Sequence, residues 1–504
     1  MTGAVEFQLR RLVAPDHDPL AAKVIGLLRQ IGTPCYLVGG TIRDALLALE
    51  PARAATSIKF DLDFAVPADG LLMARRIADR LGGAFYALDA RRDVGRVVFT
   101  IDPGTRRVVD VARFQGDTLA DDLNQRDFSV NAMALDVNQS EPALIDPHGG
   151  YLDLQAGRLR AVSGQSMQAD PLRCVRAVRL CAQLGFEIEA GTQALIQAAA
   201  PQLHRASPER LRDELMKILA LPAADGSIRL MDTLGLLSSI LPPVASLKGV
   251  AQSAPHRWDV FEHTLRTVEA LEVWLPVAGA PAHSALPFAE QIHQHLSVET
   301  TGGYRRRRLL ALAALLHDIG KPATLSREPS GRIRFLAHEV AGAELAASLL
   351  PALRFPRQAV RRVETVVRHH LRPLSLAAQG AASRRAVHRF YRDLGDAGVE
   401  VALLALADHQ ATVGPPDADA GWPALLDTVH RLLDAYFNGH ESIVAPPPLL
   451  DGHQLMQRFG LTPGPQLGQL LAELREAQAV GAVASREQAH AWVRERLNAG
   501  ISPP

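Results

Sequence analysis

Cysteine is rare in this chain of 504 residues, as are aromatic residues and lysine. The three cysteines, Cys35, Cys174 and Cys181, are odd in number and lack metal-site spacing, which argues against a disulfide framework and a cysteine-bound zinc. No apolar run is long enough to span a membrane, and no apolar stretch follows a basic start at the N-terminus. We therefore expect a cytoplasmic protein with no membrane partner.

The formal net charge is zero, so total charge does not indicate a nucleic-acid partner. Arginine supplies 49 of the 54 basic residues, and any RNA-binding surface would have to come from local clusters of it. Aromatic residues make up 5% of the chain, while Ala, Leu and Arg dominate its second half. This composition favours helices over a sheet sandwich.

Residues 20–160 alternate β-rich apolar runs with helical stretches, whereas the pattern from about 165 onward is almost wholly helical. This predicts an α+β fold. Segment 277–304 has little periodicity and is expected to be an inserted loop, and the Gly- and Pro-rich stretches 414–417 and 445–448 are expected to interrupt the helices. The expected domains are 20–160, 161–250, 251–415 and 440–504.

A strand that runs into two glycines and then a helix is predicted at Leu37–Asp44. Because Gly39 and Gly40 have no side chains, backbone N–H groups there can approach a phosphate, and the helix N-terminus adds positive potential. Arg43 would then contact a triphosphate directly. The alternative is an ordinary turn at the end of a strand.

Asp61 and Asp63 alternate with apolar residues in a strand-like run, so both carboxylates are expected on one face of a strand. Two hard oxygen ligands suit Mg²⁺, which binds one or two carboxylates together with substrate phosphates. Asp110 is a third candidate because it interrupts another valine-rich strand, where an acid needs a partner. Two metals there would activate an attacking 3′-hydroxyl and stabilise a leaving pyrophosphate. A solvated pair on an edge strand is the alternative.

Polar and apolar residues interleave at 126–134, ahead of the segment Asp146–Gly150. Arg126, Asp127 and Asn131 are candidates for binding ribose and phosphate. The alternative is a helix start capped by Asp127.

In this order and spacing, the three motifs resemble those of the class II tRNA nucleotidyltransferase and bacterial poly(A) polymerase family. The family signature is Gly-Gly-x-Val-Arg-Asp, then Asp-x-Asp, then Arg-Arg-Asp-Phe-Thr-x-Asn-Ala. This chain departs from it at Ile42, Gln125 and Ser129, and the resemblance covers residues 25–225. It implies a polymerase-β-like nucleotidyltransferase head in which Asp61 and Asp63 hold the catalytic Mg²⁺ ions.

A helix is predicted with Asp170 as its N-cap and Pro171 at its first position. Cytosine and adenine both present an amine donor beside a ring-nitrogen acceptor, so a carboxylate beside the Arg173 guanidinium would accept C and A and reject U and G. The family's Glu-Asp-x-x-Arg motif has this role; its Asp and Arg match Asp170 and Arg173, and its Glu is Ala169 here. Arg176 is a further candidate for contact with the nucleotide. A capped helix with an internal Asp–Arg pair is the alternative.

A second metal site is predicted in the helical half, where apolar segments carry His263, His317, Asp318 and Asp408. Such groups need partners in apolar helices, and imidazole plus carboxylate suits a divalent transition metal. The pattern resembles the HD phosphohydrolase superfamily over residues 256–410, which implies phosphoester hydrolysis by a metal-activated water. The resemblance further suggests Lys321 as a phosphate contact and, for another metal, His338, His369 and His370. A degenerate, structural HD domain is the alternative.

The C-terminal module 449–499 resembles the tail of nucleotidyltransferases that carry HD domains, which implies a tRNA-contacting element. Together the resemblances imply an enzyme that adds CCA, or part of it, to the 3′ end of tRNA from CTP and ATP. A poly(A) polymerase with the same head, and an HD-type metal phosphohydrolase with an RNA-binding head, are the alternatives. The sequence leaves open whether C, CC, A or the whole of CCA is added.

Overall fold

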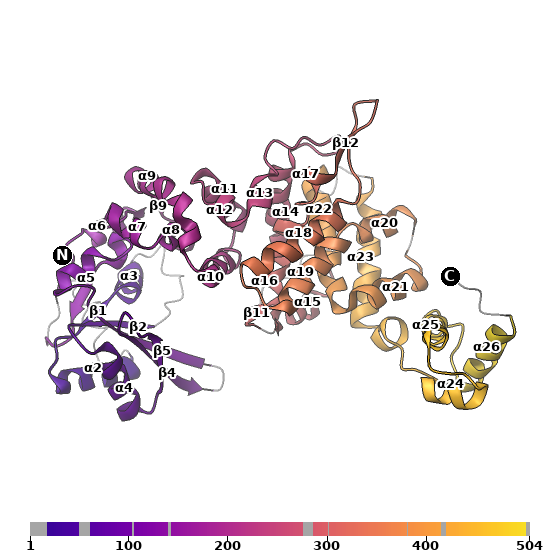
Figure 1. The fold of residues 1–504 in the computed structure, drawn as a ribbon, viewed down its shortest axis with the longest axis horizontal. Helices are drawn as coiled ribbons and strands as arrows, with labels where there is room; N and C mark the ends of the chain where they lie inside the picture. The colour runs from indigo at the N-terminus through magenta and orange to yellow at the C-terminus, as the bar shows by residue number, and fades with distance from the viewer. Residues whose placement is uncertain are drawn as a thin grey trace. The chain divides into compact units, whose positions relative to one another are not determined.

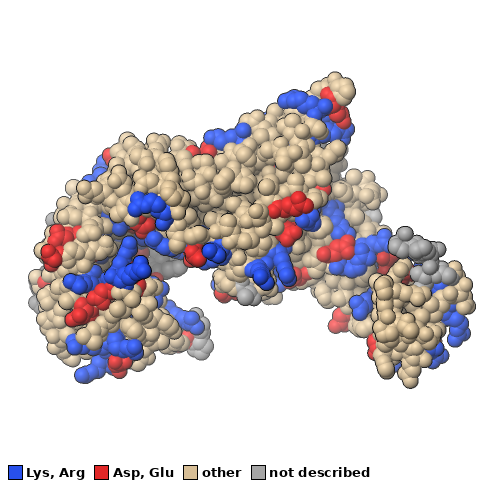
Figure 2. Space-filling view, viewed as in Figure 1, with Lys and Arg blue, Asp and Glu red and all other residues tan. Residues whose placement is uncertain are grey.

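The computed structural model describes residues 18–49, 61–102, 105–139, 143–275, 286–300, 302–380, 382–414 and 420–499. The chain divides into two units, Met1–Ser207 with Leu234–Leu236, and Pro208–Thr233 with Leu237–Pro504. The residues before Asp61 in its strand-like run and the Pro415–Asp417 stretch lie outside the described residues. Basic and acidic side chains are interspersed over the visible face, as the zero net charge leads one to expect (Figure 2).

The first unit is built on a seven-stranded sheet in the order β3-β4-β5-β2-β1-β6-β7 (Figure 1). Strands β2 and β5 are parallel, and the other neighbouring strands are antiparallel. The parallel register places Asp63 directly opposite Asp110. The strands are β1 (Tyr36–Val38), β2 (Leu62–Val66), β3 (Ala84–Asp89), β4 (Val94–Asp102), β5 (Thr105–Arg113), β6 (Ala134–Asp136) and β7 (Leu144–Ile145).

Helices complete the first unit. Helix α2 (Pro19–Ile31) starts at Asp18, whose carboxylate accepts hydrogen bonds from the first free N–H groups. Helix α4 (Gly70–Leu81) packs on β4 and β5 through an apolar stripe that includes the buried Met73 and Ile77. The remaining elements are α3 (Gly40–Leu47), α5 (Leu119–Asn124), η1 (Ser129–Asn131), α6 (Gly150–Gln155), β8 (Arg158–Leu159), α7 (Gly164–Ala169), α8 (Leu172–Leu184), β9 (Glu187–Ile188), α9 (Ala190–Ala199) and η2 (Ala200–Arg205).

The second unit is helical, which with the sheet of the first confirms the α+β prediction. Helix α16 (Arg306–Leu316) is its centre, because every residue from Leu309 to Leu316 is buried. Helices α14 (Val260–Trp274) and α19 (Arg357–His369) pack on α16, and α22 (Gly398–Val413) packs closely on α14. The other helices up to residue 444 are α10 (Pro208–Ile218), α11 (Ala224–Thr233), α12 (Leu237–Ile240), α13 (Pro242–Ala245), α17 (Lys321–Thr324), α18 (His338–Ala352), α20 (Arg372–Ala378), α21 (Arg384–Leu394), η3 (Gly395–Ala397), α23 (Trp422–Phe437) and η5 (His440–Val444).

The prediction of an inserted loop at 277–304 is wrong for the residues of this segment that the structure describes, 286–300 and 302–304. Residues Ala289–Ser297 form helix α15, and a short hairpin of β10 (Glu299–Thr300) and β11 (Tyr304–Arg305) follows it. Helix α15 buries Ile292, His295 and Leu296, a stripe too short for the apolar period to stand out in the sequence. A second hairpin, β12 (Leu325–Arg327) with β13 (Ile333–Phe335), lies between α17 and α18. Segment 276–285 lies outside the described residues.

The last three helices have a small core of their own. Helices α24 (Gly452–Phe459), α25 (Pro465–Ala479) and α26 (Arg486–Asn498) bury Leu455, Leu474 and Val493 together. A capping box between Asp451 and Gln454 starts α24. Among the helices of the described ranges, none is both long enough and apolar enough to cross a membrane.

Candidate active sites

Three carboxylates meet at the centre of the sheet in the first unit. Strand β2 starts at Leu62, so Asp61 lies just before it and is exposed, whereas Asp63 lies within it and opposite Asp110. Burial, together with the neighbouring charges of Asp110 and Asp61, raises the pKa of Asp63 to about 6. The raised pKa means that burial and the two neighbouring carboxylates disfavour the charged form of Asp63. A bound divalent cation would relieve this repulsion, so the group of three carboxylates fits a cation site.

Arg96 on β4 is a member of this site that the sequence analysis did not single out. Its Nε donates to Asp110 Oδ1 at 2.8 Å, and its Nη2 donates to Asp110 Oδ2 at 2.7 Å. In the antiparallel register Arg96 lies directly opposite Asp110, so both side chains are on one face of the sheet. The signal in the sequence is the alternation of VGRVVFTID, which puts Arg96 on a half-buried face.

The two-glycine motif lies against the carboxylates. Gly39 has φ +79° and ψ −138°, a conformation that side chains disfavour, and it precedes the first residue of α3. A Cβ at Gly39 would come within 3.3 Å of Arg126 Nη1 and 3.6 Å of Asp63 Oδ2. Glycine therefore lets the N-terminus of α3 approach the carboxylate cluster closely.

Arg43, predicted to contact a triphosphate, is buried, and its guanidinium is bonded to neighbours. Its Nη1 donates to Asn131 Oδ1 at 2.7 Å, and its Nε donates to Asp44 at 2.7 Å. Asn131 Nδ2 in turn donates to Asp127 Oδ1 at 3.1 Å, and Arg176 Nη2 lies 2.9 Å from Asp127 Oδ2. These four residues form a chain from α3 to α8.

Asp127 is the buried centre of that chain. Burial disfavours its charged form, but Arg176, Asn131 and Arg173 outweigh burial and lower its pKa. Arg126, the residue before it, donates from Nε and Nη2 to Asp122 Oδ2. The structure thus brings all the predicted residues of this motif together, largely as partners of one another.

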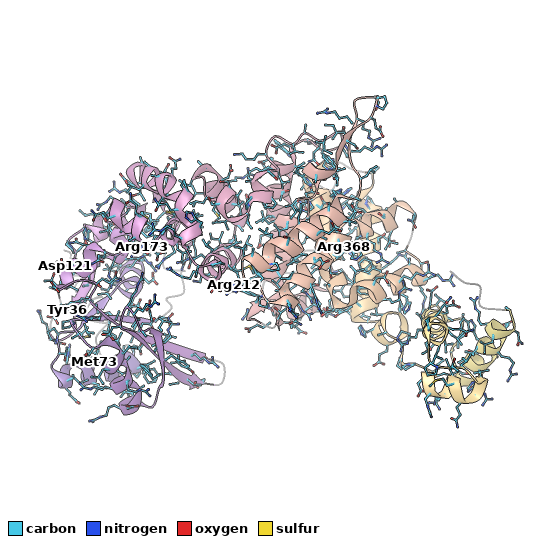
Figure 3. The ribbon with its side chains drawn as sticks, viewed as in Figure 1. Tyr36, Met73, Asp121, Arg173, Arg212 and Arg368 are labelled. Carbon is cyan, nitrogen blue, oxygen red and sulfur yellow. The ribbon has the colours of Figure 1, made fainter. Side chains whose placement is uncertain are left out.

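The predicted start of α8 is wrong by one residue. Asp170 is the C-cap of α7, in extended backbone, Pro171 is the N-cap of α8, and Leu172 is the first residue of α8. Pro171 has no N–H, so the Asp170 carboxylate accepts instead from the N–H of Leu172, at 3.3 Å. Arg173 follows in the first turn and donates from Nη1 to the carbonyl of Ser166 at 3.0 Å (Figure 3).

The surroundings of Arg173 are mixed in charge. Burial lowers its pKa, the carboxylates of Asp127 and Asp170 counteract this, and the positive charge of Arg92 adds to the lowering. Arg92 belongs to the turn between β3 and β4, so the charge of this turn also acts on Arg173, which the sequence analysis did not anticipate.

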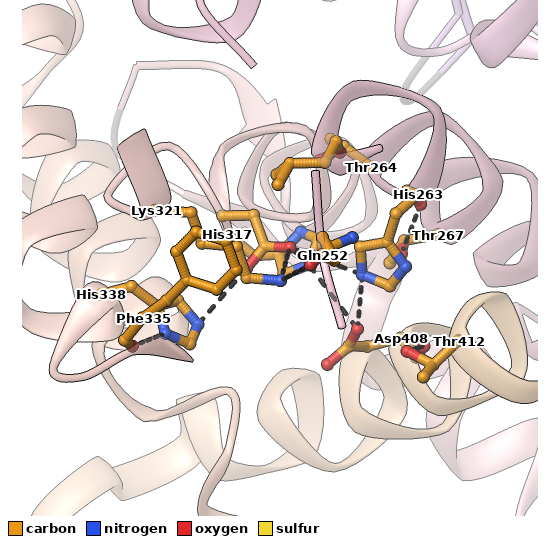
Figure 4. A network of polar contacts seen from close by, with 12 residues as sticks. Gln252, His263, Thr264, Thr267, His317, Lys321, Phe335, His338, Asp408 and Thr412 are labelled. Atoms are coloured by element: carbon orange, nitrogen blue, oxygen red, sulfur yellow. Dashed lines mark hydrogen bonds and ion pairs between the residues drawn. The ribbon is translucent and has the colours of Figure 1, made fainter. Parts of the chain in front are cut away.

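The second site lies among buried helices of the second unit (Figure 4). His263 is on α14, His317 and Asp318 follow α16, and Asp408 is on α22. His263 Nε2 lies 2.9 Å from Asp408 Oδ1, and His317 Nε2 lies 3.2 Å from Asp318 Oδ2. All four residues are buried. The structure thus assembles the predicted ligand set from three separate helical segments.

The atoms that face the centre of this site have unmet bonding capacity. The buried Nε2 atoms of His263, His317, His338 and His370 and the buried Oδ2 atom of Asp318 make no well-formed hydrogen bond. Where these atoms have close contacts, the contacts are ion pairs within the site itself, such as His263 with Asp408 and Lys321 with Asp318. Two groups of ligand atoms lie within the spacing of a metal site, His263–His317–Asp408 and His317–Asp318–His370. The donor set therefore fits one or two divalent metal ions. Of the predicted pair His369 and His370, only His370 is in these groups.

Charge is strongly polarised in this cluster. Burial disfavours the imidazolium of His317, but Asp318 and Asp408 outweigh burial and raise its pKa to about 10. Burial, with the charge of His317, lowers the pKa of His370 to about 3. In the absence of a metal, the His317 imidazolium and the Lys321 ammonium together compensate the two carboxylates.

A cavity of about 370 Å³ opens onto this cluster. Lys321 lines it and lies 2.7 Å from both Asp318 Oδ2 and Gln252 Oε1. His256, which the sequence analysis did not single out, also lines the cavity, and burial lowers its pKa to about 4. The wall formed by the β12–β13 hairpin includes Arg332, Arg334 and Phe335.

Three family models match the chain. They are described as "Poly A polymerase head domain" (residues 35–160), "Probable RNA and SrmB- binding site of polymerase A" (185–248) and "HD domain" (260–412). The first contains the carboxylate cluster, and the third contains His263, His317, Asp318 and Asp408.

Two relatives match this chain over most of its length. The A-adding tRNA nucleotidyltransferase of Deinococcus radiodurans is 36% identical over 91% of this chain and 94% of its own. The CC-adding tRNA nucleotidyltransferase of Thermus thermophilus is 33% identical over 91% of this chain and 92% of its own. Among solved structures, the apo form I of a CCA-adding enzyme aligns with a TM-score of 0.63 at 19% identity, covering 99% of this chain and 97% of that one. This last likeness concerns the fold.

Proposed function

Because this chain belongs to the tRNA nucleotidyltransferase family, we propose that it adds CMP or AMP, as part of the CCA sequence, to the 3′ end of tRNA. The main support is the cluster of Asp61, Asp63 and Asp110 beside Gly39 at the start of α3. We assign nucleotide addition to residues 20–160, base choice to 161–250, phosphoester hydrolysis to 251–415 and tRNA contact to 440–504. The substrates, CTP, ATP and tRNA, place this work in the cytoplasm.

In the proposed reaction the tRNA 3′-oxygen bonds to the α-phosphorus of the nucleotide. The bond from that phosphorus to the bridging oxygen breaks, and pyrophosphate leaves. Asp61 and Asp63 would hold Mg²⁺, which lowers the pKa of the attacking hydroxyl and stabilises the leaving pyrophosphate. Gly39 keeps the space beside Asp63 open, and the N-terminus of α3 supplies N–H groups toward the phosphates. Arg96 holds Asp110 in place by a bidentate pair.

Base choice is proposed for Asp170 and Arg173. The Asp170 carboxylate would accept from the exocyclic amine of C or A, and Arg173 would donate to the ring nitrogen. The chain Arg43–Asn131–Asp127–Arg176 supports this pair, because it ties α8 to the helix that starts at the two glycines. We assign these four residues to positioning of the nucleotide-binding elements.

The extent of addition is tested with three tRNA transcripts, ending at the discriminator base, after C and after CC. Each is incubated with CTP, ATP or both and Mg²⁺, and products are resolved at single-nucleotide length. Because relatives that match most of this chain are A-adding and CC-adding enzymes, we expect either CC addition that stops or A addition only to the CC-ended transcript. Three additions would extend the proposal to the whole of CCA, and long A-tails would replace it with poly(A) polymerase.

A second candidate function, metal-dependent phosphoester hydrolysis, is favoured by the buried ring nitrogens and carboxylates that converge in the second site at the spacing of metal ligands. His263, His317, Asp318 and Asp408 would hold a divalent metal, which supplies a nucleophilic water. Lys321, at the cavity wall, would contact the phosphate. The test is the metal content of purified protein and hydrolysis of p-nitrophenyl phosphate and bis(p-nitrophenyl) phosphate. We expect His263→Ala to lose both the bound metal and the hydrolytic activity. If the wild-type protein binds no metal and hydrolyses neither substrate, this domain has a structural role.

A further inference from the structure

Five arginines gather where α21 packs against α25 in the second unit, and we call Arg372, Arg384, Arg385, Arg389 and Arg392 the arginine cluster. We propose that the arginine cluster binds the phosphate backbone of the RNA substrate. This inference rests on the proposed function, since it takes tRNA as the ligand. None of the five residues lines the cavity of the HD-like site.

One carboxylate on α25 holds three of these arginines. Arg389 donates two parallel hydrogen bonds to Glu476, Nε to Oε2 and Nη2 to Oε1, both at 2.8 Å. Arg385 Nε lies 2.9 Å from Glu476 Oε1, and Arg392 Nη1 lies 4.0 Å from Oε2. Arg385 and Arg392 each approach this carboxylate through a single nitrogen, so their guanidinium groups keep further N–H donors for another anion.

The charges of the cluster do not balance. Asp393 is the other carboxylate in it, and it pairs with both Arg372 and Arg392. Arg384 donates to the carbonyls of Ala479 and Ser442, which carry no charge. Five guanidinium groups therefore share two carboxylates, and three positive charges remain uncompensated within the cluster.

The surface is exposed and polar, as a phosphate-binding surface requires. The side chains of Arg385, Arg389 and Arg392 are 60%, 51% and 48% exposed, whereas Glu476 is 15% exposed. Because Glu476 is buried beneath the arginines, their guanidinium groups lie toward solvent. Figure 2 shows basic side chains gathered near α21.

An RNA backbone fits this surface better than a protein does. Protein interfaces have an apolar core, and no large exposed apolar side chain is found on α21 or α25 among the described residues. Nucleic-acid interfaces are polar and strongly positive, and the guanidinium fork matches a phosphate in bidentate geometry. The cluster thus supplies the local arginine concentration that a chain of zero net charge needs to bind RNA.

The competing interpretation is that these arginines only clamp α25 to α21. The two interpretations predict opposite effects of Glu476→Gln. A phosphate site loses a competing negative charge and binds RNA at least as tightly as before. A clamp is weakened by Glu476→Gln as much as by loss of its arginines.

The experiment measures the Kd of the full-length protein for a tRNA transcript between 50 and 250 mM KCl, a range over which phosphate contacts change affinity strongly. The variants are Arg385→Gln/Arg392→Gln, which keeps the bidentate Arg389–Glu476 pair, and Glu476→Gln. Arg431→Gln on α23 is the matched control, because Arg431 is 50% exposed and pairs with Asp427 one turn away on the same helix. Melting temperatures establish that each variant folds.

We expect the double variant to bind about tenfold more weakly, with its log Kd–log salt slope reduced by about 1 to 2. Arg431→Gln should match wild type, and Glu476→Gln should bind at least as tightly. An unchanged slope in the double variant, or equal weakening in Glu476→Gln, overturns the proposal in favour of a clamp or another partner. Nucleotide addition at saturating tRNA is followed in parallel. A wild type that extends no tRNA contradicts the proposed function, whereas a normal wild type with unchanged variants contradicts only this inference.

Discussion

Arg96 and Asp110 face each other across adjacent strands and form a bidentate ion pair with N–O distances of 2.8 and 2.7 Å. Asp63 lies on the other side of Asp110, in register with it. One guanidinium thus sits at the edge of a group of three carboxylates and compensates one of them. The negative charge that remains is the physical reason for expecting a divalent cation at this point.

This arrangement predicts a pH dependence of nucleotide addition. The pKa of Asp63 is raised to about 6, so protonation removes its carboxylate as the pH falls below that value. At low Mg²⁺ we expect kcat/KM to fall toward pH 6 and below, and higher Mg²⁺ should move this limb to lower pH because the cation favours the carboxylate. Initial rates across pH 5–8 at several Mg²⁺ concentrations test this.

Arg96→Gln should move the acid-side fall of kcat/KM to higher pH, since Arg96 lowers the pKa of Asp63 in the wild type. Arg91→Gln, in the exposed turn between β3 and β4, is the control and should leave the profile unchanged. If kcat/KM falls at the same pH in Arg96→Gln as in the wild type, a group other than Asp63 controls the acid side of the profile.

The two glycines should differ sharply when each is replaced by alanine. In Gly39→Ala the positive φ costs about 1–3 kcal/mol, and the new Cβ crowds Arg126 and Asp63. We expect a loss of at least about tenfold in kcat, since near 1.4 kcal/mol corresponds to tenfold. In Gly40→Ala the new Cβ comes only to 3.4 Å from Arg43 Nη2, an ordinary van der Waals distance, and the variant should stay near wild type. Steady-state kinetics with melting curves measure both, and equal effects would contradict the role of Gly39.

Metal binding at the second site should distinguish two adjacent histidines. His370→Ala removes a ring nitrogen from the ligand groups and should lower bound metal per chain, whereas His369→Ala should not. A metal present at about 100 times its Kd stabilises the fold by about 2.7 kcal/mol, so a chelator should lower the melting temperature of wild type and of His369→Ala. Elemental analysis and thermal melts are the measurements, and equal metal loss in both variants would contradict the assignment.

Glu400 should control stability toward acid in the second unit. It is buried, Arg362 Nε donates to it at 2.7 Å, and His295 Nε2 lies 3.1 Å away. Burial opposes ionisation, but His295 and Arg362 outweigh burial and lower the pKa of Glu400. Its stabilisation is therefore complete above the unfolded value near 4.5 and is lost as the pH falls through the lower folded value.

Glu400→Gln should cost about 3 kcal/mol near neutral pH, because it removes the buried carboxylate that pairs with Arg362 and leaves that guanidinium only the more exposed Asp396. The difference in unfolding free energy from wild type should narrow below about pH 4.5, the pKa of a Glu side chain in an unfolded chain, and vanish as Glu400 is protonated in the folded state. Glu364→Gln, which removes a partly exposed pair with Arg368 within one helix, should change the free energy of unfolding by less than about 1 kcal/mol. Denaturant unfolding between pH 3 and 8 measures these differences.

Local patterns in the sequence were sufficient to predict several strands and helix starts and to single out many candidate site residues. Alternation identified β2, β4 and β5, and the glycine pair marked the start of α3 because only glycine adopts the backbone of Gly39. The ligand set His263, His317, Asp318 and Asp408 was predicted by motif, and it converges in space. Their catalytic roles stay predictions.

Only the tertiary structure decided which partners the polar residues have. Arg96 and His256 enter their sites from neighbouring segments with no motif of their own, and His370 rather than His369 faces the metal cluster because one residue turns a helical side chain by about 100°. Arg43 is bonded to Asn131 because the sheet brings residues 88 positions apart together. The sequence by itself determined residue chemistry and local backbone preference, which depend on near neighbours. Partner choice depends on distances between distant segments, and those are set by packing of the whole fold.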